Sequence, residues 1–257
     1  MQTIHLLETA SPRIKQTPTP RISPQPPVPL LHIGQPGVMD MIVNAIHRHP
    51  VLVQLPSVFA LMAAPTTEGA RQLDACKMRL EGKNYGTAIG SLHRFIAQAQ
   101  PGALPAQFNN TGHFSGMTGS FIRMRFREKN FDSKTIRSGT HQGLLLNGVL
   151  RELFRRIENS FSEYPPDEIW NGRNYNAPLC TSCNVSGHPD GSITTLDKAI
   201  QFAHGRSIPF IITATATIGE KGSYPVFGFS EDGVHIHRAG PGLEWFKEKI
   251  PVALRNW

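Results

Sequence analysis

Short apolar runs of strand length alternate with segments of helical periodicity through most of this chain of 257 residues. The spacing of apolar residues predicts strands over residues 51–55, 85–89, 120–126, 178–184, 208–212, 226–229 and 234–238. It predicts helices over residues 38–47, 67–80, 91–97, 144–161, 194–204 and 243–249. Such alternation is typical of α/β proteins, so we expect a twisted open mixed sheet flanked by helices.

Two proline- or glycine-rich stretches lie outside this pattern. Eight prolines occur in residues 10–36, four of them within residues 24–29. We therefore expect residues 1–36 to form an extended arm and residues 37–257 to form one α/β domain. Residues 100–119 are rich in Gly, Pro and Asn and have no period, which predicts a long loop.

The charge and cysteine content of the chain indicate which ligands it binds and in which compartment we expect it. Lys and Arg exceed Asp and Glu by 26 − 19 = 7, and eleven His residues accompany them. This balance favours polyanionic ligands such as nucleotides, RNA or acidic metabolites. Three Cys do not form a disulfide framework, and no apolar run approaches the roughly 20 residues of a membrane span. The N-terminal residues lack a signal-peptide core, so we expect a cytoplasmic protein with no membrane partner.

Lys77 and Arg79 stand at the carboxyl end of the second predicted helix. Two cations one residue apart cannot share a helix face, but both can reach one anion from a helix end. A polyphosphate fits such a pair, and a solvated helix end is the alternative.

Ser182 and Asn184 follow the predicted strand over residues 178–184, with Thr181 beside them. Open α/β sheets place their ligands at the carboxyl ends of strands, so these small polar side chains are candidate hydrogen-bond donors to an anion. Cys180 and Cys183 form a C-x-x-C without a second pair, and we expect no metal site there. Residues 219–223 lack the spacing of a Walker A motif and predict a hairpin turn.

Lys77, Arg79, Ser182 and Asn184 together resemble the KxR…SxN tetrad of the YrdC-like family, whose members include threonylcarbamoyl-adenylate synthases. Residues 178–189 are similar to the family's strand followed by S-A-N-x-S-G-x-P. Residues 234–240 are similar to its closing I-x-R-x-G strand, and residues 55–59 to its opening P-T-E segment. The opening segment is shorter here and lacks the acidic residue and the Gly, which predicts an altered substrate.

The resemblance implies an adenylate-forming enzyme, a nucleotidyltransferase that acts in tRNA modification. A carbamate made from L-threonine and bicarbonate would attack the α-phosphorus of ATP and expel pyrophosphate, giving threonylcarbamoyl-AMP, with Mg²⁺ accompanying the nucleotide. Lys77 and Arg79 would neutralise the triphosphate, and Ser182 and Asn184 would hydrogen-bond phosphate or carbamate oxygens. Further contacts are expected on the nucleotide side from Thr181, Arg125 and Arg238, and on the substrate side from Ser57 and Phe59.

Two alternatives keep the fold and change the function. YrdC-like domains also occur in carbamoyltransferases that act through carbamoyl-adenylate, with a carbamoyl donor in place of the amino acid. The family fold also carries a basic concave surface, so a non-catalytic module that binds double-stranded RNA is the other alternative. RNA or a downstream transferase would then be the macromolecular partner.

Overall fold

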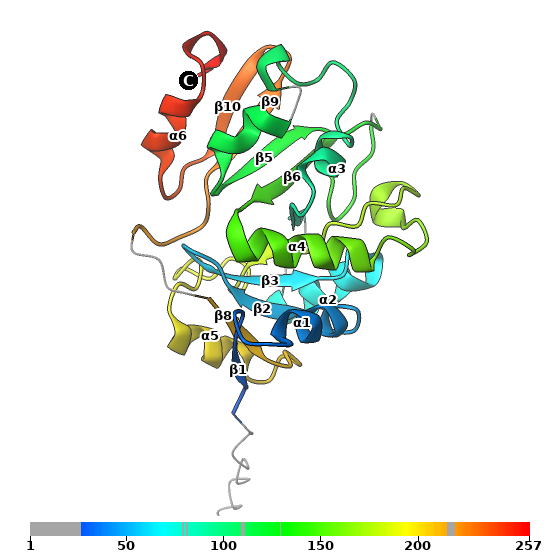
Figure 1. Ribbon diagram of the computed structural model, residues 1–257, viewed down its shortest axis with the longest axis vertical. Coiled ribbons are helices and arrows are strands. Elements are labelled where there is room, and N and C mark those ends of the chain that lie inside the picture. Colours follow the sequence, from blue (N-terminus) through cyan, green and yellow to red (C-terminus); the bar gives the residue numbers. More distant parts are fainter. Residues whose placement is uncertain (1–26, 79, 81, 109–110, 129, 215–218) are drawn as a thin grey trace, which may run out of the picture.

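The computed structural model describes residues 27–257 except 79, 81, 109–110, 129 and 215–218. Within these residues ten strands form one sheet in the order β1-β8-β2-β3-β7-β4-β6-β5-β9-β10 (Figure 1). Parallel and antiparallel pairs both occur, so the expected mixed α/β sheet is confirmed. The strands are β1 (Leu30–His32), β2 (Val51–Gln54), β3 (Phe59–Ala63), β4 (Gly86–Ala88), β5 (Ser120–Arg125), β6 (Thr140–Leu145), β7 (Leu179–Ser182), β8 (Ile211–Thr213), β9 (Val226–Ser230) and β10 (Gly233–Arg238).

Helices cover the sheet because successive strand residues point to opposite faces and both faces carry apolar side chains. Helices α1 (Val38–Ile46) and α4 (Gly148–Ser160) pack on one face, and α2 (Thr67–Lys77) and α5 (Leu196–Ala203) on the other. Helices α3 (Leu92–Ile96) and α6 (Leu243–Lys249) cover β5, β9 and β10, together with the 3₁₀ turns η1 (Ala106–Phe108) and η2 (Thr111–Met117). Two further short 3₁₀ turns are η3 (Glu168–Trp170) and η4 (Val252–Leu254).

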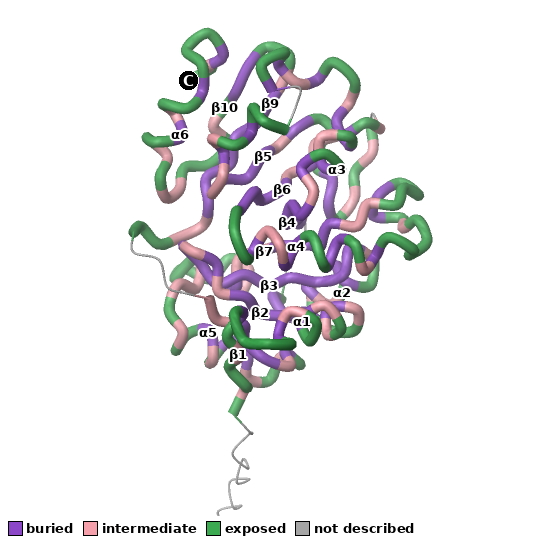
Figure 2. Tube along the Cα trace, in the orientation of Figure 1, coloured by how far each residue is buried: buried purple, intermediate pink, exposed green. Residues whose placement is uncertain are grey.

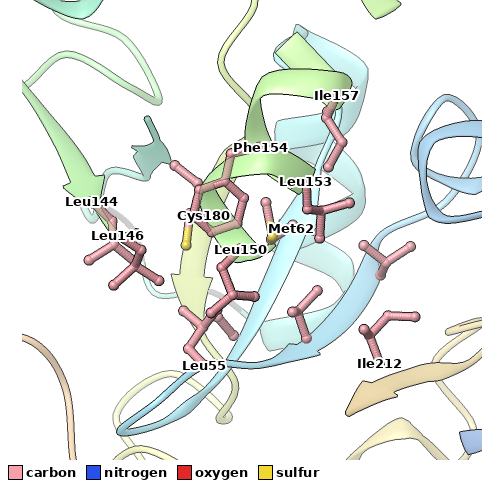
Figure 3. Packing of buried hydrophobic residues seen from close by; sticks show 14 of the residues in the cluster. Leu55, Met62, Leu144, Leu146, Leu150, Leu153, Phe154, Ile157, Cys180 and Ile212 are labelled. Atoms are coloured by element: carbon pink, nitrogen blue, oxygen red, sulfur yellow. The ribbon is translucent and has the colours of Figure 1, made fainter. Parts of the chain in front are cut away.

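The core beneath α4 shows how the layers interlock. Leu150, Leu153 and Phe154 descend from the helix toward Met62 of β3 and Cys180 of β7 (Figure 3). All five are buried, and Figure 2 shows the central strands as a continuous buried layer between exposed helix surfaces. This packing fixes the carboxyl end of β7 at the centre of the sheet.

Most predicted elements are confirmed, and the differences have local causes. β3 and β6 were not expected, and Leu144 and Leu145 end β6 instead of beginning a helix, which starts at Gly148. Leu144 packs against α4 and Leu145 packs against Met117, as strand alternation requires. The stretch over residues 100–119 contains η1 and η2, so it is not an irregular loop throughout.

The proline-rich segment enters the described region at residue 27. Residues 30–32, which lie in the expected arm, form β1 and pair in parallel with β8. Residues 1–26 lie outside the described residues. None of the helices in the described part of the chain is long and apolar enough to cross a membrane.

Glu158 joins α4 to the connection between β4 and α3. Its carboxylate accepts the Ser91 N–H at 2.6 Å and lies 3.9 Å from the Arg94 guanidinium. Only 2% of Glu158 is exposed. Burial raises the pKa of Glu158 from 4.5 to about 6, so the folded protein holds the proton on this carboxyl to a higher pH than the unfolded chain does.

The raised pKa of Glu158 predicts a pH-dependent loss of stability. The folded protein binds this proton more tightly than the unfolded chain, so the free energy of unfolding falls as the pH rises from about 4.5 to 6. Glu158→Gln should lack this part of the fall, about 2 kcal/mol for a shift of this size. Urea unfolding of both proteins at pH 4 and pH 7 measures the difference. Identical pH slopes would contradict the prediction.

Candidate functional site

Helix α2 and strand β7 bring the two predicted signatures together. Thr66 caps α2 by accepting the Gly69 N–H at 3.0 Å, and the helix ends at Lys77. Met78 then takes a left-handed conformation with φ 47°, which turns the chain out of the helix. β7 lies between β3 and β4 and ends at Ser182. The helix end therefore meets the carboxyl end of a central strand.

Lys77 lies where the end of α2 contacts the end of β7, and only 2% of the residue is exposed. Its ammonium group donates hydrogen bonds to the Ser182 carbonyl and, at 2.9 Å, to Asn184 Oδ1. Ser182 Oγ donates to the same Asn184 oxygen at 2.9 Å, and Ser186 N–H donates to the Lys77 carbonyl at 2.9 Å. Lys77, Ser182 and Asn184 are thus one hydrogen-bonded unit, whereas Arg79 lies outside the described residues.

A cavity of about 210 Å³ opens beside this unit. Lys77, Lys83 and Arg238 contribute three cations to its lining, and none of the described lining residues is acidic. The other polar lining residues include Thr181, Ser182, Asn184, Asn84 and Gln142. Positive charge with amide and hydroxyl groups around it suits an anionic ligand.

Two further predicted nucleotide contacts lie at this cavity, Thr181 and Arg238. Thr181 precedes Ser182 on β7, and Arg238 ends β10. The Arg238 guanidinium donates to the Tyr224 carbonyl through Nε at 3.1 Å and Nη2 at 2.6 Å. It also lies 5.8 Å from the centre of the Phe121 ring, which lines the cavity. These contacts hold Arg238 at the wall of the cavity.

Arg125 does not line the cavity, so the structure does not bring it together with Lys77 and Ser182, and its contact with an anion stays a prediction. It shares a strand face with Phe121 but stands four residues further along β5, about 13 Å at the usual rise per residue. It lines a separate small hollow beside Gly102 and Ser230. The polar strand face was predicted correctly, but the cavity ends before Arg125.

Ser57 and Phe59, the two residues predicted to contact the substrate, do not line the cavity either. Phe59 is buried on the opposite face of β3, where it packs in the core with Leu73 of α2, while its neighbour Ala60 lines the cavity. Alternation along a strand allows only one of these two neighbours to face the cavity. Ser57 lines an adjoining recess, and its N–H donates to the Tyr224 hydroxyl at 3.4 Å.

Sequence reasoning missed several residues that line the cavity, among them Lys83, Gln142 and Tyr224. Lys83 follows Lys77 by six residues in the same helix-to-strand connection, so its charge was a usable signal. Gln142 belongs to the unexpected strand β6, and Tyr224 precedes β9 by two residues. Neither Gln142 nor Tyr224 belongs to a local sequence pattern that predicts a position at the cavity.

The cysteines near the site are protected thiols. Burial raises the pKa of Cys180 and of Cys183 to about 12, so both remain protonated near neutral pH. A protonated thiol is neither a good nucleophile nor a metal ligand. Within the described residues no three His, Cys, Asp or Glu side chains gather as a metal site. The chemistry of the cavity therefore depends on its cations, amides and hydroxyls.

Asn184 is expected to stabilise the fold as well as the site. Asn184→Ala removes one acceptor of the buried Lys77 ammonium and the acceptor of Ser182 Oγ. We expect the free energy of unfolding to fall by about 2 kcal/mol, the range for hydrogen bonds to charged groups. Ser186→Ala is the control, because Ser186 bonds Lys77 through its backbone, and it should change stability by less than about 0.5 kcal/mol. Denaturant unfolding that ranks the two variants equally would refute this.

Comparison by sequence finds no family model and no curated protein that matches the chain. Solved structures do match it. P. abyssi Sua5 complexed with L-threonine aligns with a TM-score of 0.65 at 16% identity, over 88% of this chain and 61% of that one. E. coli YciO aligns with a TM-score of 0.56 at 12% identity, over 85% of this chain and 98% of that one. Full-length HypF in its phosphate- and nucleotide-bound form aligns with a TM-score of 0.57 at 14% identity, over 79% of this chain and 29% of that one.

The extent of these matches differs between the neighbours. The chain spans about three fifths of the length of the Sua5 structures and nearly all of YciO. Sequence identities between 12% and 16% support a shared fold but do not establish a shared reaction. The chain therefore has the fold of the Sua5 and YciO structures, as the resemblance to the YrdC-like family implied.

Proposed function

We propose that this chain binds ATP at the cavity beside Lys77 and forms a carbamoyl-type adenylate there. The observation that carries the proposal is the Lys77–Ser182–Asn184 unit, which lies at the carboxyl end of a central strand in a cavity lined by cations and by no described acidic residue. A triphosphate carries several negative charges, and such a lining attracts it. The same lining opposes a cationic ligand.

The size of the cavity indicates which part of the substrate it holds. Sites for whole small molecules usually have about 300–1,000 Å³, and this cavity has about 210 Å³. We therefore assign it to the reacting end of the nucleotide, the triphosphate and the group that attacks it. Lys77, Lys83 and Arg238 would contact phosphate oxygens, and Ser182 and Asn184 would contact phosphate or carbamate oxygens.

The proposed reaction needs charge stabilisation more than proton transfer. A carbamate oxygen forms a bond to the α-phosphorus, and the bond from that phosphorus to the pyrophosphate oxygen breaks. The carbamate is already ionised near neutral pH, so no general base is required. Lys77, with Arg79 as the resemblance implies, would stabilise the charge that develops on pyrophosphate. Because no described lining residue is a carboxylate, Mg²⁺ would arrive on the nucleotide phosphates and not on a protein site.

The structural neighbours support two candidates for the group that is activated. The Sua5 structure contains L-threonine, which supports an amino-acid carbamate. The nucleotide-bound HypF structure supports a nucleotide site, and the altered segment at Ser57 and Phe59 is compatible with the carbamoyl alternative. Pyrophosphate release measured with ATP and L-threonine plus bicarbonate, and separately with ATP and carbamoyl phosphate, distinguishes the two. Salt-sensitive RNA binding without pyrophosphate release would instead favour a binding module.

Lys77→Met tests the proposed role of the buried cation. Methionine has nearly the same length and no charge, so it removes the charge with little change in packing. We expect kcat/KM for pyrophosphate release to fall by roughly 150-fold, since one strong electrostatic contact contributes about 3 kcal/mol to the transition state. Lys198→Met is the control, because Lys198 is an exposed cation of α5 whose partner is Asp190. Unchanged turnover in folded Lys77→Met would refute the assignment of the site.

A further inference from the structure

Gly86 lines the cavity from β4, and the space beside it leaves no room for a side chain. Its backbone does not require a glycine, because Gly86 is not among the residues with a positive φ. A Cβ at this position would lie 2.7 Å from Phe121 Cε1 and 3.2 Å from the Gln142 carbonyl oxygen. Carbon atoms in contact are normally about 3.5–4.0 Å apart. The absent side chain of Gly86 is therefore the space that the Phe121 ring fills.

The Phe121 ring reaches Gly86 by extending across a strand. Phe121 belongs to β5, and β6 lies between β5 and β4 in the sheet. Neighbouring strands are about 4.8 Å apart, so a contact between side chains two strands apart needs a large residue on one strand and a small one on the other. Phe121 also lines the cavity and is 8% exposed. Its ring is therefore part of the cavity wall, with β4 on one side.

Arg238 lies on the other side of the same ring. β10, which ends at Arg238, is separated from β5 by β9, on the side away from β4. The guanidinium lies 5.8 Å from the centre of the Phe121 ring, within the range in which an aromatic face attracts a cation. Nε and Nη2 donate to the Tyr224 carbonyl, whereas Nη1 has no partner among the residues that the structure describes. Burial lowers the pKa of Arg238, as expected for a cation held partly out of water.

We propose that Gly86 and Phe121 are positioning residues that set the place of Arg238 against the phosphate groups of the ligand. The absent side chain at Gly86 lets the Phe121 ring lie against β4, and the ring and the Tyr224 carbonyl together hold the guanidinium with Nη1 left for the ligand. A side chain at position 86 would push the ring away from β4, toward the cavity and Arg238. This inference rests on the proposed binding of a triphosphate in the cavity, and it assigns a role to two apolar residues that touch no charge on the ligand.

Calorimetric titration with inorganic triphosphate tests the contact between Gly86 and Phe121. Gly86→Ala should weaken binding about tenfold, because the displaced ring moves Arg238 away from the anion and a hydrogen bond to a charged group is lost. Phe121→Leu alone should weaken binding about threefold, the value expected for one partly exposed contact between a cation and a ring. Leucine lacks the ring atoms that meet the new Cβ. The double variant Gly86→Ala/Phe121→Leu should therefore bind about threefold more tightly than Gly86→Ala, and this rescue is not expected of general damage to the fold.

Gly143→Ala is the matched control for crowding the sheet. Gly143 belongs to the neighbouring strand β6, and a Cβ there would lie 2.5 Å from Phe95 Cε2 and 2.6 Å from Ile89 Cγ1. These two residues belong to the core under α3, and Gly143 does not line the cavity. Gly143→Ala should therefore lower the melting temperature and leave the affinity for triphosphate unchanged. Equal losses of affinity in Gly86→Ala and Gly143→Ala would overturn the proposal.

A second cycle shows whether Phe121 acts through Arg238. Arg238→Gln should weaken triphosphate binding at least about tenfold, because a charged donor is lost. Adding Phe121→Leu to Arg238→Gln should cause no further loss, since the ring then has no guanidinium to hold. The same threefold loss with and without Arg238 would overturn the proposal. This cycle keeps Gly86, so it decides the question even where Gly86→Ala does not fold.

The failure of this inference is distinct from the failure of the proposed site. Wild-type affinity in folded Gly86→Ala, or no rescue by Phe121→Leu, would overturn the positioning role while triphosphate still binds to the wild-type chain. A wild-type chain that binds no triphosphate would refute the cavity as a phosphate site, and the positioning role with it.

Discussion

The buried ammonium group of Lys77 is the interaction on which the site depends. A cation that is 2% exposed must be compensated, and here the Ser182 carbonyl and the Asn184 amide oxygen provide neutral acceptors. Both of these acceptors are neutral oxygens that hold the ammonium group by hydrogen bonds. The same bonds tie the end of α2 to the end of β7, so the site and the local fold stabilise each other.

The site residues that could be predicted are those marked by a local pattern in the sequence. Lys77, Ser182 and Asn184 each stand at the end of an element whose period is clear in the sequence, and α/β sheets bring such ends together. The position of Arg125 away from the cavity could not be predicted, because alternation identifies the face of a strand but not how far along it a cavity extends. The orientation of Phe59 could not be assigned because β3 was not recognised from the sequence.

The missed strands share one physical cause. β3 is buried at every position, so it lacks the alternation of polar and apolar residues that marks a half-exposed strand. β6 ends in Leu144 and Leu145, which pack on opposite faces of the sheet, yet adjacent leucines leading into α4 also fit a helical pattern. Only the pairing of β6 with β4 and β5 decides between the two, and pairing is not local information. The Gln142 contact to the cavity was therefore inaccessible to sequence reasoning.

Tyr224 is shared by the cavity and by the adjoining hollow at Ser57 and α6. Its side chain lines both, and burial raises the pKa of its hydroxyl to about 12, so it remains a neutral phenol near neutral pH. Arg238 holds its carbonyl and Ser57 N–H donates to its hydroxyl, so the ring is anchored at both ends. Tyr224 is therefore a fixed, neutral part of the wall of the cavity.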